Sequence, residues 1–192
     1  MTSLSRTRRE TGQASPLYIF VVASLLFLAL AFFAVGQAGA TRNGAQSAAD
    51  AAALAAAREQ RDSFELTIDD LGDLLSGEFT PAFDGCDASG YYAGQNGADV
   101  VGCVPLTDGR WGSRVSVTSQ KPVGDTILPG TDTLTAKATA TAIVVPRCSF
   151  DPAEEADTPS PGSLDCEGEV TDLDLELLPE MSDLFDVRLA ED

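Results

Sequence analysis

Four cysteines are the side chains whose type and spacing most directly suggest chemistry: Cys86, Cys103, Cys148 and Cys166. They permit three disulfide connectivities, and sequence alone does not choose among them. We favour Cys86 with Cys103 and Cys148 with Cys166, because each bond then closes a local loop without crossing the other. A zinc site of four thiolates is the alternative, but the close C-x2-C pairs typical of such sites do not occur in the sequence. Disulfides require an oxidising compartment.

Carboxylates are the other abundant reactive groups. The 192-residue chain has 30 acidic and 12 basic residues, a formal net charge of -18 and no histidine. This composition removes the commonest general base and metal ligand, and it disfavours nucleic acid as a partner, because phosphate binding needs clustered Lys and Arg. No nucleophile elbow, phosphate loop or metal-ligand cluster occurs, so a carboxylate-pair enzyme has only the abundance of Asp and Glu to support it. We therefore predict a protein that is not an enzyme, with no catalytic residue, metal ligand, cofactor or small-molecule substrate.

Much of the negative charge lies in residues 151–192, which contain fifteen acidic residues and one basic residue. Such runs are usually solvated, although a docking segment for a partner is an alternative. A calcium site is a third interpretation, because Asp172, Asp174 and Glu176 alternate, but no EF-hand spacing accompanies them. We expect a loop over 151–163 and an alternating strand over 171–178. A short helix after Pro179 should then run through Leu189, with Met181, Phe185 and Leu189 on one side.

The element that must position these groups begins near the N-terminus. Arg6, Arg8 and Arg9 precede a stretch that carries no charge from residue 11 to residue 41. Within it, residues 16–35 are almost entirely apolar, and as a helix they would span roughly 30 Å, the thickness of a bilayer's hydrocarbon core. The positive-inside rule places the N-terminus in the cytoplasm and the C-terminal part outside the cell. A signal peptide cleaved after Ala40 is the rival interpretation, and a buried helix of a soluble protein is a third.

Helical character continues beyond this span. Residues 42–62 are rich in strong helix formers and contain no proline. Small residues recur every four positions, and we call them the small-residue stripe: Gly36, Ala40, Gly44, Ala48 and Ala52. The stripe either packs on the protein's own small domain or is a docking face for neighbouring subunits.

The remainder predicts an α+β fold. Leucines up to residue 75 indicate a further helix that ends near Gly77, and a glycine-rich, turn-rich region follows. Residues 114–119 and 134–145 have strand character and could pair antiparallel. The expected organisation is a basic cytoplasmic head (1–13), a transmembrane helix (14–36), an Ala-rich stalk helix with its continuation (37–76), an extracellular β-rich domain (77–150) and an acidic segment (151–192).

The N-terminal third resembles the Flp pilus-assembly proteins of the tight-adherence TadE/TadG-like group, particularly the actinobacterial type. A basic head, a Gly and one membrane helix precede the most specific piece, a motif just outside the membrane that we call the family motif: Gln46, Asp50, Ala51, Ala52, Ala53 and Leu54. The sequence AKATATA (136–142) is similar to the Ala-containing β segment of such domains. Processed pilins carry Glu at the fifth place after the Gly, whereas here Leu17 follows Gly12 at that place.

The resemblance implies a minor-pilin-like or assembly role without enzymatic activity. The predicted function is that of a single-pass envelope protein whose partners are the lipid bilayer and other pilus-assembly or envelope proteins. The alternative is a membrane-anchored extracellular module that binds a ligand or ion through the acidic segment.

Overall fold

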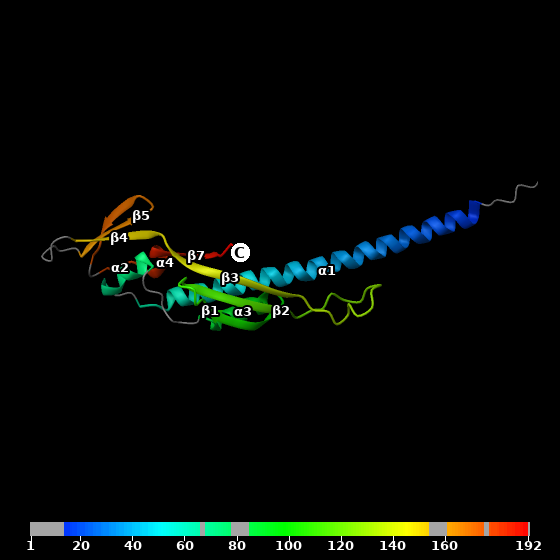
Figure 1. Ribbon diagram of the computed structural model, residues 1–192, viewed down its shortest axis with the longest axis horizontal. Coiled ribbons are helices and arrows are strands. Elements are labelled where there is room, and N and C mark those ends of the chain that lie inside the picture. The colour runs from blue at the N-terminus through cyan, green and yellow to red at the C-terminus, as the bar shows by residue number, and fades with distance from the viewer. Residues whose placement is uncertain (1–13, 66–67, 78–84, 154–160, 175–176, 192) are drawn as a thin grey trace, which may run out of the picture.

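The fold was analysed in a computed structural model that describes residues 14–65, 68–77, 85–153, 161–174 and 177–191. A single helix, α1 (Ala14–Asp62), runs for 49 residues, which corresponds to about 73 Å at 1.5 Å per residue. Its N-terminal half projects from the molecule, while the rest of the chain lies around and beyond its C-terminal half (Figure 1). The predicted cytoplasmic head and Gly12 lie outside the described residues.

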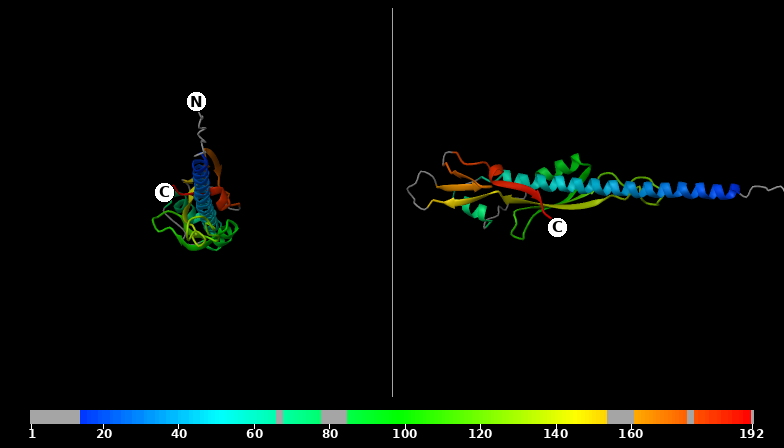
Figure 2. Two further views of the ribbon diagram at one scale, coloured as in Figure 1. Left: turned by 90° about the vertical axis from the view of Figure 1, so that its right-hand side faces the viewer. Right: turned by 90° about the horizontal axis from the view of Figure 1, so that it is seen from above.

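Two antiparallel sheets follow α1. Strands β1 (Ala98–Pro105), β2 (Gly112–Ser119), β3 (Lys137–Pro146) and β7 (Phe185–Leu189) form the larger sheet in the order β1-β2-β3-β7. Strands β4 (Cys148–Pro152), β5 (Gly162–Cys166) and β6 (Glu169–Asp172) form the smaller one. The smaller sheet lies at the end of the molecule opposite the free half of α1 (Figures 1 and 2). The α+β class and the antiparallel pairing of β2 with β3 are thus confirmed.

The core is formed where α1 crosses the larger sheet. The helix contributes fully buried alanines, and β3 meets them with inward side chains that are also small, among them Ala140 and Ala142. The neighbouring strand β2 adds Val115 and Val117, both completely buried. Alternation along each strand sends Thr139 and Arg114 to the other face. Because both surfaces are nearly smooth, helix and sheet approach closely, and small groups fill the space between them.

Larger side chains close the core at the C-terminal end of α1. The ring of Trp111 lies edge-on to Phe185, with centroids 5.2 Å apart, and edge-on to Phe64 at 6.4 Å. The Nη1 group of Arg61 donates a hydrogen bond to the carbonyl oxygen of Phe185 at 3.2 Å. This bond ties the last turn of α1 to the start of β7.

Helix α2 (Ile68–Ser76) agrees with the predicted further helix, but the turn-rich region after it is not all turn. Residues expected to be irregular form helix α3 (Asp87–Gln95) and strand β1. Two contacts to α1 hold α3 despite its glycines: the backbone N–H of Ala88 donates to Oε2 of Glu59 at 2.7 Å, and Ser89 and Ala93 are buried. A carboxylate at a helix N-terminus satisfies a free N–H and the helix dipole.

The acidic segment differs from prediction in three places. The ends of the expected 151–163 loop belong to strands β4 and β5. Strand β6 ends at Asp172, so the prediction of a strand over 171–178 is mostly wrong. The helix through Leu189 is also wrong, because α4 (Met181–Leu184) stops and the chain becomes strand β7. The i, i+4 spacing of Met181, Phe185 and Leu189 suits a helix, but pairing with β3 provides five residues of ladder instead.

Overpacking should expose the dependence on small side chains. We expect Ala52→Leu to lower the free energy of unfolding by about 1–3 kcal/mol, because a fully buried site would have to admit three more carbon atoms. Thermal unfolding of the full chain in detergent, followed by the fluorescence of buried Trp111, measures this change. The matched control is Gly44→Leu on the exposed surface of α1, where an added Cβ meets nothing within 4 Å. Equal melting temperatures for the two variants would contradict the packing argument.

Candidate functional site

The candidate functional site is a set of surfaces along α1. In the first of them, residues 16–35, nearly every large apolar side chain is exposed: Leu17, Tyr18, Ile19, Phe20, Val21, Val22, Leu25, Leu26, Phe27, Leu28, Leu30, Phe32, Phe33 and Val35. Within the part of the chain that the structure describes, α1 is the one helix long and apolar enough to cross a membrane. Water is a poor solvent for such a surface, and a bilayer is a good one.

Two hydroxyl groups in and next to this surface are satisfied within the helix. The hydroxyl of Ser24 donates to the carbonyl oxygen of Phe20 at 2.8 Å, and that of Thr41 donates to the carbonyl of Gln37 at 3.1 Å. Such return bonds to the preceding turn lower the cost of placing a hydroxyl in or near lipid. The helix then continues without interruption from Val35 into the core. The apolar span and the folded domain therefore share one rigid element.

The small-residue stripe is divided by its own geometry. Ala48 and Ala52 are completely buried beneath the sheet, whereas Gly36, Ala40 and Gly44 are exposed. Steps of four residues advance a 3.6-residue helix by about 40° beyond a full turn, so a row of four steps drifts by roughly 160°. The C-terminal end of the stripe, Ala48 and Ala52, thus faces the protein's own domain. Its N-terminal end, from Gly36 to Gly44, faces outward.

The family motif is likewise shared between surface and core. Nε2 of Gln46 donates to Oδ1 of Asp50 at 2.8 Å on the outside of the helix. Ala52 and Ala53 are fully buried, and Ala51 and Leu54 lie at the margin of the core. The polar members of the motif therefore mark the outward face of α1, and the apolar members form its seat under the sheet.

A groove follows the outward face where α1 and α3 meet. Eight residues line it: Ala51, Leu54, Ala55, Arg58, Glu59, Asp62, Ala88 and Tyr92. Tyr91 and Tyr92 stand beside it with their rings edge-to-face at 5.3 Å, and their exposed fractions are 66% and 46%. Exposed tyrosines beside an apolar groove are typical of protein contact surfaces. Sequence reasoning missed this groove, because only the Tyr-Tyr pair within a glycine-rich run hinted at it.

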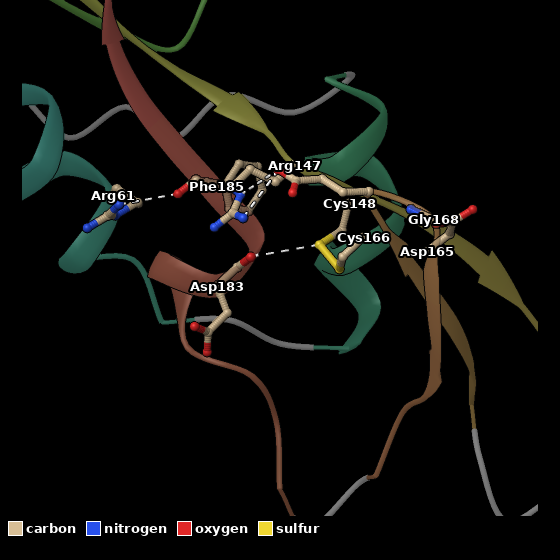
Figure 3. A network of polar contacts seen from close by, with 9 residues as sticks. Arg61, Arg147, Cys148, Asp165, Cys166, Gly168, Asp183 and Phe185 are labelled. Atoms are coloured by element: carbon tan, nitrogen blue, oxygen red, sulfur yellow. Dashed lines mark hydrogen bonds and ion pairs between the residues drawn. A yellow bond between two sulfur atoms is a disulfide. The ribbon is translucent and has the colours of Figure 1, made fainter.

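Both disulfides follow the non-crossing arrangement. Cys86–Cys103 joins the residue before α3 to β1, and Cys148–Cys166 joins directly paired positions of β4 and β5. The second bond lies beside the junction of α4 and β7 (Figure 3). There the N–H of Arg147 donates to the carbonyl of Leu184 at 2.8 Å, and its guanidinium pairs with Glu167 at 3.2 Å. This bond and these contacts hold the smaller sheet against the C-terminal strand.

The described carboxylates of the candidate calcium site, Asp172 and Asp174, occupy different structural positions. Asp172 ends β6, Asp174 forms an isolated bridge with Leu177, and Glu176 lies outside the described residues. No group of three or more His, Cys, Asp or Glu side chains with metal-binding geometry occurs among the described residues. Elsewhere, hydrogen bonds from the side chain and backbone of Arg110 lower the pKa of the exposed Asp108 carboxyl group.

Comparison with known proteins gives one match. Residues 12–59, about a quarter of the chain, match the sequence model of the Tad family, described as Flp pilus-assembly TadE/G-like. The matched range covers the apolar span, the small-residue stripe and the family motif, and the predicted resemblance is confirmed over that range. No curated protein and no solved structure matches the chain.

The disulfide pairing can be tested by mass without perturbing the fold. Trypsin cuts after Arg61, Arg110, Arg147 and Arg188, which places each cysteine pair inside its own peptide, 62–110 or 148–188. Under non-reducing conditions we expect these two peptides to remain separate, each lighter than its reduced form by two hydrogen atoms. Either of the other pairings would covalently join the two peptides, so a single linked species would show the assignment to be wrong.

Proposed function

We propose that the chain is a non-enzymatic, single-pass envelope protein that takes part in Flp pilus assembly through helix packing and protein contacts. The observation that carries the proposal is the family match over residues 12–59, which includes α1 from its first residue, Ala14, to Glu59. That helix places an exposed apolar span and a buried alanine face in one continuous element. A protein built this way holds a folded domain at a fixed height above a membrane.

In this proposal the N-terminus lies in the cytoplasm and the disulfide-bonded domain lies outside. The three arginines before the span support this orientation. Two disulfides support it independently, because they persist in oxidising compartments. The charge pattern and the disulfides thus support the same orientation.

Retention of the span is favoured over cleavage after Ala40. Ala34 has only 2% of its surface exposed, and Oε1 of Gln37 is buried. The segment between β2 and β3 runs beside this part of α1 in both views (Figures 1 and 2). Part of the exported domain therefore packs on residues that cleavage would remove.

The groove between α1 and α3 supports contact with another protein of the assembly. It combines alanine and leucine surface with charged groups at its rim, including Arg58 and Asp62, and Tyr92 forms one side. This mixture of an apolar centre and a polar rim fits a helical partner. The proposal assigns to this groove the contact that the family's assembly role requires.

Intact mass of the protein extracted from membranes tests the anchor. We expect the mass of a chain that retains residues 16–40, because the span stays in the bilayer. Protease added to intact cells or spheroplasts should digest the exported domain while an N-terminal epitope tag survives. A mature form beginning at Thr41 would refute the anchor, and a protected domain with a digested tag would reverse the orientation.

Complementation tests the pilus role and the groove together. In a strain lacking this gene we expect less Flp pilin in sheared surface fractions, and the wild-type chain should restore it. Tyr92→Asp should not restore it, because a charge enters the apolar side of the groove. Val170→Asp, a change at a 66% exposed position of β6, is the matched control and should restore pili. Normal pili in the deletion strain would remove the proposed role, and restoration by Tyr92→Asp would remove the groove from it.

A further inference from the structure

The segment between β2 and β3, residues 120–136, extends beyond the sheet along α1 toward the apolar span (Figures 1 and 2). The segment lies against α1 at Gly124, where an added Cβ would be 4.0 Å from Nε2 of Gln37. Gln37 is two residues past Val35, or about 3 Å along the helix axis. This segment therefore reaches the level at which α1 leaves the hydrocarbon in the proposed orientation.

The tip of the segment is apolar and exposed. Residues 126–131 read TILPGT and carry no charge. Ile127 and Leu128 have exposed fractions of 41% and 52%. The segment that carries them runs along α1 toward the apolar span, whose own large side chains are also exposed (Figure 1). The tip thus presents exposed apolar side chains on the part of the domain that reaches toward the span (Figure 1).

Part of the backbone of the tip is already hydrogen-bonded within the segment. The N–H of Leu128 donates to Oγ1 of Thr126 at 3.1 Å, and its carbonyl accepts from Oγ1 of Thr131 at 3.1 Å. Pro129 has no N–H to satisfy. The carbonyl of Gly130 accepts from Thr133, and that of Thr131 accepts from the N–H of Leu134. Polar backbone groups paired in this way can leave water at low cost.

We propose that this tip is a second membrane contact: Ile127 and Leu128 insert into the headgroup–acyl boundary of the outer leaflet beside α1. The inference rests on the proposed membrane span. Asp125 and Asp132 flank the tip, and charged carboxylates stay at the aqueous side of the boundary, so the insertion is shallow. The tip would fix both the height and the rotation of the domain against the bilayer surface.

Lipid-borne quenchers test the contact in the full chain reconstituted into phosphatidylcholine–phosphatidylglycerol vesicles. An NBD fluorophore is attached through Leu128→Cys, with both native disulfides kept oxidised, and nitroxide lipids labelled near the headgroup are added. We expect blue-shifted emission at position 128 and quenching at least about twice that of a probe at Leu177→Cys, a 78% exposed position of the exported domain. A third probe at Leu26→Cys, within the span, should respond most strongly to nitroxides deep in the acyl chains.

The three probes separate the possible failures. Quenching at position 26 with position 128 no more quenched than position 177 would overturn the loop contact and leave the membrane span intact. No quenching at position 26 would overturn the span itself. Blue-shifted emission at position 128 without lipid quenching would show that protein, such as a second copy of the chain, covers the tip, and it would also overturn the proposal.

Discussion

The close packing of alanine against alanine between α1 and β3 is the constraint on which the rest of the structure depends. Completely buried Ala48, Ala49, Ala52, Ala53 and Ala56 on the helix meet a strand whose inward positions include Ala140 and Ala142. Each contact buries little area, so its contribution is small, and stability accumulates only over the length of the crossing. This explains why the helix is long and straight and why disulfides and an aromatic cluster reinforce the domain away from the crossing.

The two halves of α1 distribute apolar groups differently, so one half suits lipid and the other suits the protein core. In the span, large aliphatic and aromatic side chains surround the helix on all sides, as lipid allows. In the core, the side chains become small, and polar groups such as Gln46 and Asp50 face outward. The change occurs without a helix break, so no hinge separates anchor from domain. The apolar span and the helix–sheet crossing therefore belong to one continuous element.

Sequence predicted those parts of the fold that are set by local pattern. The span, the long helix, α2 and the β2–β3 pair follow from composition and periodicity over many residues. Helix α3 and strand β7 did not, because each depends on a distant partner. Glu59 on α1 holds the first turn of α3, and the edge of β3 converts residues 185–189 from a plausible helix into a strand. Neither the groove between α1 and α3 nor the tip between β2 and β3 could be predicted, because neither has a recognisable local sequence pattern.

The geometry of α1 also determines which part of the helix surface is open to other molecules. Ten residues separate Val35 from Ala45, the first buried alanine after Ala34, so the run of buried alanines that leads into the core begins about 15 Å beyond the end of the apolar span. Since a helix advances by about 100° per residue, this spacing fixes the direction of the sheet as well as its height. Gly36, Ala40 and Gly44 occupy the intervening stretch with open surface around each. Because these side chains are small, this stretch is the part of α1 to which another backbone can come nearest.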